Sequence, residues 1–203
     1  MLVDRLTAEF RTRGAAGFIR FVMSRLCQWR EDVLYEADLT KVTRDPTFKP
    51  LQSVVLVGKH NFGSAETATV EREVLTDVNH AYRDALRGDD LMFVGTDGGM
   101  ITTYGFVMFD SYSKKILGEA KETPMIGNCY TLPEHRRQGL YARLLVTICA
   151  RLAEMGHRRA IITCAPDNTA SMRGIEKAGF TRVHSSKSLL IAARWIAFQS
   201  TSR

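Results

Sequence analysis

TLPEHRRQGLY, residues 131–141, is the stretch that decides the fold, because in it the end of an apolar strand runs through a short turn directly into a strong helix. The turn holds two arginines, a glutamine and Gly139. The first N–H groups of a helix have no partner inside it and lie at the positive end of the helix dipole. Gly139 would let a ligand approach this backbone closely. The stretch therefore predicts a phosphate or pyrophosphate site, although a strand, turn and helix of this kind can also be a plain connection.

On both sides of this stretch, the spacing of apolar residues predicts a mixed α/β chain with one sheet and no internal repeat. The predicted strands are 33–39, 51–57, 91–96, 101–109, 126–132 and 160–164, followed by two possible closing strands at 181–184 and 189–195. The predicted helices are 4–30, one or two helices over 65–87, then 140–155 and 170–178. Turns are predicted at 97–99 and around Lys114 and Lys115.

A second informative stretch is NTASMRGIEKAGF, residues 168–180, which follows the predicted strand 160–164. Asn168 is placed to cap a short helix, and Gly179 is placed to end it. Taken by itself, this stretch predicts a well-capped helix and nothing more.

Together the two stretches resemble the GNAT superfamily of acyl-CoA-dependent N-acyltransferases. RRQGLY at 136–141 is similar to that family's Arg/Gln-x-x-Gly-x-Gly/Ala loop, and residues 168–180 are similar to its Asn-x-x-Ser…Glu-Lys-x-Gly-Phe segment. The resemblance covers roughly residues 64–200. It implies a GNAT-like α/β fold, with a central mixed sheet and flanking helices, over residues 51–203. Residues 1–50 would form an N-terminal helical extension and a first strand region.

The resemblance also implies acetyl-CoA as a co-substrate and no metal. The pantetheine arm would lie between the strands 126–132 and 160–165, where they part, and pair with backbone groups near Thr131 and Leu132. Backbone N–H groups from Arg137 to Ala142 would hold the pyrophosphate. The cofactor-binding residues implied in this way are Thr131, Leu132, Arg136, Arg137, Gln138, Gly139, Leu140, Tyr141, Ala142 and Asn168.

The reaction implied is the direct attack of a small-molecule primary amine, such as an amino sugar or an amino-acid derivative, on the thioester. A backbone N–H of the strand 126–132 would bind the oxyanion, and a base or a chain of waters must take a proton from the amine. Glu119 and Glu122, just before this strand, are candidate bases, or else solvated charges of a turn. Tyr130 and Ser171 are candidate proton donors, although Tyr130 also suits a core or pocket wall.

Two residues depart from the family's pattern. Tyr141 stands where the loop usually has Gly or Ala, so its side chain must point away from the pyrophosphate or reshape the pocket. Ile175 stands where many members carry a Tyr that protonates the leaving thiolate. The alternative function is therefore a non-catalytic module of the same fold that binds CoA or works through protein contacts.

The composition excludes several other classes. The chain has 203 residues, of which 45% are hydrophobic and 25% charged, which suits a globular domain and not a disordered or fibrous one. Its longest apolar runs are far shorter than the roughly 20 residues that span a membrane, and its N-terminal segment lacks the pattern of a secretory signal. The four cysteines are isolated, which favours free thiols in a reducing compartment. We therefore expect a cytoplasmic protein.

The positive charge is gathered in two places. The chain has 28 Lys and Arg against 22 Asp and Glu, a net charge of +6, and the excess lies in residues 1–30 and 134–159. These two clusters do not make the continuous basic stripe of a nucleic-acid-binding face, so we expect no nucleic-acid partner. The apolar face of the predicted N-terminal helix could pack on the protein, form a homodimer contact or lie on an anionic membrane, and the membrane is not favoured.

Overall fold

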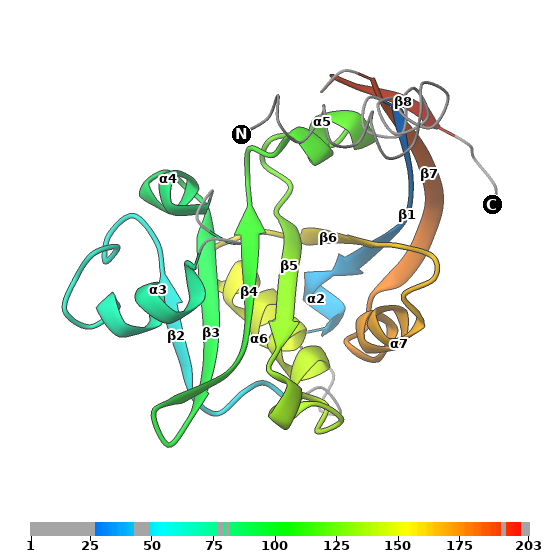
Figure 1. The fold of residues 1–203 in the computed structure, drawn as a ribbon. Helices are drawn as coiled ribbons and strands as arrows, with labels where there is room; N and C mark the ends of the chain where they lie inside the picture. Colours follow the sequence, from blue (N-terminus) through cyan, green and yellow to red (C-terminus); the bar gives the residue numbers. More distant parts are fainter. Residues whose placement is uncertain (1–26, 43–48, 77–78, 80–81, 192–193, 200–203) are drawn as a thin grey trace, which may run out of the picture.

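The computed structural model describes residues 27–42, 49–76, 79, 82–191 and 194–199 (Figure 1). The strands are β1 (Cys27–Asp38), β2 (Val54–Val57), β3 (Leu91–Asp97), β4 (Met100–Met108), β5 (Met125–Thr131), β6 (Arg159–Cys164), β7 (Thr181–Ile191) and β8 (Arg194–Gln199). The helices are α2 (Leu39–Val42), α3 (Ala68–Val74), α4 (Tyr82–Arg87), α5 (Tyr112–Leu117), α6 (Leu140–Glu154) and α7 (Thr169–Lys177), with a 3-10 turn, η1 (Pro133–His135). Over the described residues, these strands form one sheet of 8 strands in the order β2-β3-β4-β5-β6-β1-β7-β8. The sheet is mixed, because β5 and β6 run parallel while the other neighbours run antiparallel.

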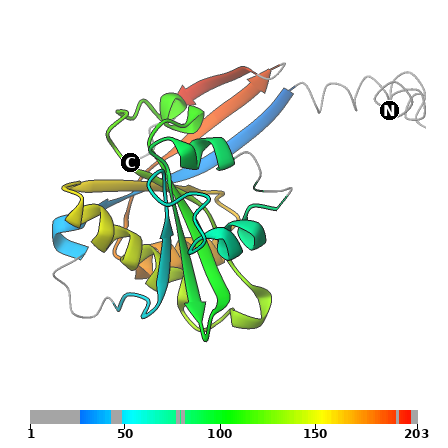
Figure 2. The same ribbon diagram turned by 90° about the vertical axis from the view of Figure 1, so that its left-hand side faces the viewer.

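Helices cover both faces of the sheet (Figures 1 and 2). On one face α6 buries its apolar stripe, including Leu144 and Ile148, against the central strands. On the other face Val74 of α3 and Leu86 of α4 share a second core cluster with Phe106 of β4. The structure confirms the helix predicted over 140–155 and the strands predicted on both sides of it. None of the described helices is both long and apolar enough to cross a bilayer.

The first described strand, β1, lies inside the sheet, between β6 and β7. Its residues pair on both sides, as where Val33 faces Cys164 on β6 and Ser185 on β7. The strand predicted from residue 33 is therefore part of a longer one. The helix predicted over 4–30 is wrong at its end, because residues 27–30 already belong to β1, and its remaining residues lie outside the described part. Residues 27–30 pair with β7, and this pairing outweighs a helix-like spacing of apolar residues.

A short helix, α5, stands where the sequence predicted a turn around Lys114 and Lys115. The Ser111 side chain caps it by accepting a hydrogen bond from the Lys114 N–H, and Gly118 ends it in a left-handed conformation, with φ of 70°. The Lys114 ammonium is buried and donates to the carbonyls of Phe109 and Lys121, each at 2.7 Å. Because these partners lie on both sides of α5, a lysine that reads as a surface residue in the sequence instead holds the segment together.

The end of the chain also differs from the prediction. One strand, β7, runs through 181–191, so it joins the segment predicted at 181–184 to the first part of the one predicted at 189–195. β8 follows at 194–199 and pairs with β7 at the edge of the sheet. Several of the polar residues between the two predicted segments are buried serines. These are Ser185, Ser186 and Ser188.

The parallel neighbours β5 and β6 pair only where they begin. The two pairs of facing residues are Met125–Ile161 and Ile126–Ile162. Beyond these pairs both strands continue but no longer bond to each other. We call this opening, between residues 127–131 of β5 and residues 163–164 of β6, the fork. The structure thus contains the parted strands that the resemblance implied.

Candidate active site

The turn between β5 and α6 presents free backbone N–H groups. Arg137 and Gly139 both have left-handed backbones, with φ of 64° and 73°, and α6 begins directly after them. The Arg143 N–H makes the first bond of the helix, to the Gly139 carbonyl at 3.1 Å. Within the described part of the chain, the N–H groups of residues 139–142 have no acceptor. A side chain at Gly139 would meet no atom within 4 Å, so a ligand can reach these amides.

The basic and amide side chains of this turn differ in how free they are. The Arg136 guanidinium folds back over β5, where it donates to the Thr131 carbonyl at 3.1 Å and lies over the Tyr130 ring at 5.4 Å. Arg137 and Gln138 are exposed, and neither side chain has a hydrogen-bond partner among the described residues. These two are therefore the side chains of the turn that can reach a ligand without first breaking a contact.

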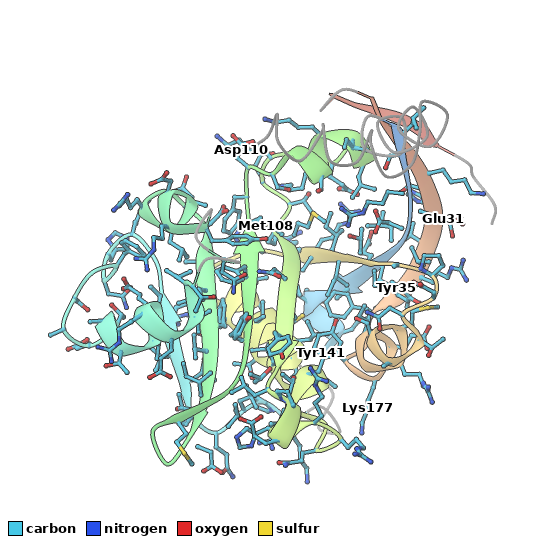
Figure 3. All side chains as sticks on the ribbon, in the orientation of Figure 1. Glu31, Tyr35, Met108, Asp110, Tyr141 and Lys177 are labelled. Atoms are coloured by element: carbon cyan, nitrogen blue, oxygen red, sulfur yellow. The ribbon has the colours of Figure 1, made fainter. Side chains whose placement is uncertain are left out.

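Tyr141 points away from the turn and into the contact between α6 and α7 (Figure 3). Its hydroxyl shares a hydrogen bond of 3.0 Å with the Ser171 hydroxyl, and its ring packs on Gly174. Burial raises the pKa of the Tyr141 hydroxyl well above its usual range. The sequence left open whether the Tyr141 side chain points away from the turn or reshapes the pocket. The structure shows that it points away and does not cover the N–H groups of the turn.

Two further residues of the second stretch, Asn168 and Ile175, have structural roles. The Asn168 side chain caps α7 by accepting a hydrogen bond of 3.1 Å from the Ser171 N–H, as its position predicted. Ile175 is fully buried in the main core, at 0% exposure, so it has no polar group to offer a leaving thiolate. Ser171, a predicted alternative proton donor, already bonds to Tyr141.

The backbone at the end of β5 is less free than the sequence indicated. The Leu132 N–H donates to the Thr102 carbonyl at 3.0 Å, and the Leu132 carbonyl accepts from His135 at 2.9 Å. The Thr131 carbonyl accepts the Arg136 guanidinium, as described above. A ligand arm in the fork would therefore pair mainly with residues of β5 that come before Thr131.

The two predicted bases lie at the other end of the β5–β6 pair. Glu119 is held by Arg159 in two hydrogen bonds of 2.6 and 2.8 Å, and its side chain is only 12% exposed. Arg159 also bonds to Glu36, and these carboxylates raise the pKa of the guanidinium further. Glu122 is exposed and lies beside a cavity at the far end of α6. Both carboxylates come before the paired part of β5, so the structure does not bring them to the fork.

Tyr130, in contrast, lies on the fork, with 41% of its surface exposed. Its ring stands 5.6 Å from that of Tyr104 on β4. Beside it are two residues that the sequence analysis missed, Asn128 on β5 and Asn79, whose side chains bond to each other at 2.6 Å. The signal for Asn128 was the Gly-Asn pair inside an otherwise apolar strand, which is typical of a bulge.

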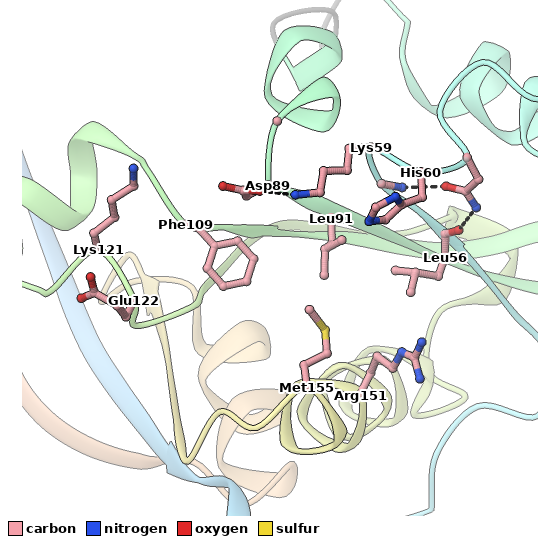
Figure 4. Close-up of a pocket in the computed structure, with 13 residues that line it drawn as sticks. Leu56, Lys59, His60, Asp89, Leu91, Phe109, Lys121, Glu122, Arg151 and Met155 are labelled. Carbon is pink, nitrogen blue, oxygen red and sulfur yellow. Dashed lines mark hydrogen bonds and ion pairs between the residues drawn. The ribbon is translucent and has the colours of Figure 1, made fainter.

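A cavity of about 880 Å³ lies at the C-terminal end of α6, between that helix and the sheet (Figure 4). Leu56 and Leu91 line it from the sheet and Phe109 from just after β4, and Met155 points toward them from the end of the helix. Lys59 and Asp89 at its rim are joined by an ion pair of 2.8 Å. The cavity and the free amides lie at opposite ends of α6.

The described thiols behave as core groups. Cys129, Cys149 and Cys164 are free cysteines, and burial raises the pKa of the first two to about 12. A thiol with so high a pKa is no nucleophile at neutral pH. Among the described residues, no group of three or more His, Cys, Asp or Glu side chains is placed to hold a metal ion.

A mixed sheet with one forked parallel pair, followed by a helix whose first amides are free, offers backbone donors of the kind that bind phosphate groups. The model of the Acetyltransferase (GNAT) family matches residues 64–180 of this chain. That match covers more than half of the sequence, and the chain belongs to this family. The family resemblance read from the two sequence stretches is confirmed. No curated protein matches the sequence.

Solved structures of other proteins share the fold. A Drosophila protein matches with a TM-score of 0.54 and 14% identity over 91% of this chain and 58% of its own. A GNAT-family acetyltransferase from Colwellia psychrerythraea matches with a TM-score of 0.53 and 14% identity over 85% of this chain and 57% of its own. A putative GNAT-family acetyltransferase from Novosphingobium aromaticivorans matches with a TM-score of 0.50 and 16% identity over 79% and 63%. This chain thus spans less than two thirds of each of those chains, and at such identities the likeness is one of fold.

Proposed function

We propose that this protein is an acetyl-CoA-dependent N-acetyltransferase whose acceptor is a small-molecule primary amine, such as an amino sugar or an amino-acid derivative. The observation that carries the proposal is the row of free N–H groups at residues 139–142, which opens beside the fork. Family membership supports the acetyl transfer. The amine is inferred from the resemblance.

The turn and the fork have separate tasks in this proposal. The amides of residues 139–142 bind the pyrophosphate, and the free side chains of Arg137 and Gln138 add contacts to it. The pantetheine arm then lies in the fork, along the edge of β5. The bulge at Asn128 and Cys129 takes backbone groups out of regular pairing with β4, so an N–H there is available for the oxyanion.

The chemical step is a direct transfer. The lone pair of the neutral amine forms the new N–C bond to the acetyl carbon, the C–S bond breaks, and the proton lost by the amine nitrogen is balanced by one gained by the sulfur. Tyr130 is the predicted proton donor that lies on the fork, and we assign it the protonation of the thiolate. Water at the exposed fork removes the amine proton, because Arg159 already holds Glu119 and Glu122 lies at the other end of α6.

Binding is tested at Gly139, where a carboxylate would repel the pyrophosphate. We expect millimolar acetyl-CoA to raise the melting temperature of the wild type and to leave that of Gly139→Asp unchanged. Gly139→Asn is the matched control, because it has almost the same shape, tolerates a left-handed backbone and carries no charge, so it should retain part of the shift. Circular dichroism checks that both variants fold. A Gly139→Asp protein that binds acetyl-CoA like the wild type would show that the phosphates are placed wrongly.

Turnover separates the enzyme from the non-catalytic alternative. We expect a panel of primary amines to contain at least one that releases free CoA thiol from acetyl-CoA faster than the uncatalysed background. Tyr130→Phe should lower kcat while leaving acetyl-CoA binding intact. A protein that binds acetyl-CoA but turns over no amine in a broad panel would instead be the binding module.

A further inference from the structure

Asn128 occupies an unusual place on the fork. Tyr104 faces Tyr130 and Phe106 faces Gly127, so Gly105 of β4 stands opposite the two bulged residues of β5. Asn128 is the first of these two, and its backbone is left-handed, with φ of 45°. It lies just past the last pair that joins β5 to β6. The side chain is therefore held where the arm of a bound thioester would pass.

The orientation of the Asn128 amide follows from its neighbours. Asn79 is buried, at 3% exposure, and its side-chain nitrogen donates to the Val74 carbonyl at 2.9 Å and to the Tyr104 hydroxyl at 3.2 Å. A backbone carbonyl only accepts hydrogen bonds, so the Asn79 amide cannot be turned the other way. Its oxygen must then face Asn128, which presents its own nitrogen at 2.6 Å.

This fixed orientation leaves one group of Asn128 without a role. Its Nδ2 is bound to Asn79, but its Oδ1 has no hydrogen-bond partner among the described residues. The residue is exposed, and Asn79 ties it to the face of the sheet that α3 and α4 cover. An acceptor without a partner in the described part of the chain, oriented by buried Asn79, therefore stands at the fork on the face opposite α6.

We infer that Asn128 binds the acceptor amine: its Oδ1 accepts a hydrogen bond from the amine N–H while the nitrogen lone pair is directed at the acetyl carbon. The inference rests on the proposed function. A neutral amide suits this task better than a carboxylate, because a negative charge would favour the protonated ammonium, which has no lone pair for the attack. Asn79 acts through Asn128 and is a positioning residue.

The chain offers a matched pair of variants. Asn128→Gly removes the amide but keeps a residue that adopts the left-handed backbone freely, so the bulge is retained. Asn128→Ala removes the same amide and also strains the backbone. If the side chain is what matters, kcat/KM falls equally in the two variants, and only Asn128→Ala is also less stable. Met155→Gln, in the cavity at the other end of α6, is the control that should leave turnover unchanged.

The experiment measures acetylation of three probe amines, glucosamine, glycinamide and hydroxylamine, by thiol release, together with acetyl-CoA binding by calorimetry. In Asn128→Gly we expect kcat/KM for the best probe amine to fall about tenfold, the worth of roughly one hydrogen bond, with acetyl-CoA affinity within about twofold of the wild type. Unchanged kcat/KM in that variant overturns the inference, whereas a wild type that binds acetyl-CoA but acetylates no amine overturns the proposed function. A wild type that does not bind acetyl-CoA at all likewise overturns the proposed function and not the inference alone.

Discussion

The neighbouring carboxyl groups of Asp89 and Asp90 should contribute to folding stability with opposite dependence on pH. Asp90 is buried, and its Oδ1 accepts a hydrogen bond of 2.8 Å from the Phe109 N–H. Burial raises the pKa of this carboxyl above its usual 3.8. A folded pKa above the unfolded one means that the folded state favours the protonated form, so this group's contribution to stability falls as pH rises through that window.

We therefore expect Asp90→Asn to gain in stability relative to the wild type as pH rises above 3.8. The measurement is urea unfolding of both proteins at several pH values, compared as differences. Asp89→Asn is the control with the opposite sign, because a hydrogen bond from Lys59 lowers the pKa of Asp89. Its disadvantage against the wild type should grow as pH rises toward 3.8. If the difference in unfolding free energy from the wild type changed with pH in the same direction for both variants, the opposite pKa shifts assigned to Asp89 and Asp90 would be wrong.

For single residues, the sequence predicted those whose role depends only on their neighbours along the chain. The glycine of the turn, the cap at Asn168 and the free amides of α6 are local features, and the structure has them where they were expected. Groups that act through distant partners were not predictable in the same way. Arg159 comes 40 residues after Glu119, and Asn128 comes 49 residues after Asn79. Only the folded sheet brings these side chains together.

At the scale of elements, the contact between α6 and α7 depends on a glycine. A Cβ atom at Gly174 would overlap the Tyr141 ring. Gly to Ala within a helix ordinarily stabilises it by about 0.5–1 kcal/mol, whereas overpacking a tight contact costs about 1–3 kcal/mol. We expect the second effect to win, so Gly174→Ala should lower the free energy of unfolding, as measured by urea denaturation.

A double-mutant comparison identifies the cause. In a Tyr141→Ala background the ring is gone, and Gly174→Ala should become neutral or stabilising. In a Tyr141→Phe background the ring remains, and the cost should persist although the bond to Ser171 is lost. An equal cost in all three backgrounds would mean that the ring is not what Gly174 accommodates.

The elements themselves were predicted unevenly. α6 carries a long apolar stripe that is buried against one sheet face, so its pattern and its surroundings agree. α5 is short and depends on the buried ammonium of Lys114, and a lysine gives no sign in the sequence that it is buried. The start of β1 was assigned to a helix because β7, the strand with which it pairs, is far away in the sequence.

At the scale of the whole molecule, the division into residues 1–50 and 51–203 stays a prediction, and Tyr35 on β1 tests it. Tyr35 is fully buried in the main core, and its hydroxyl donates to Glu176 at 3.1 Å. Replacing a buried aromatic by alanine costs about 3–5 kcal/mol. We expect Tyr35→Ala to destabilise the entire sheet by about that amount, in one cooperative transition. The exposed Met100→Ala is the control and should change little. Two separate transitions, one unchanged, would show that the first 50 residues fold apart from the rest.

The position of β1 also governs when the protein can become complete during synthesis. Its two neighbours, β6 and β7, are translated about 130 and 150 residues after the residues they pair with. β1 is therefore synthesised early and stays without its strand partners until β6 and β7 have left the ribosome. Such long-range pairing slows folding and lengthens the interval in which nascent chains can stick to each other. We expect chaperones that bind nascent chains to raise the yield of folded protein more for this chain than for a protein of the same size whose adjacent strands are consecutive in the sequence.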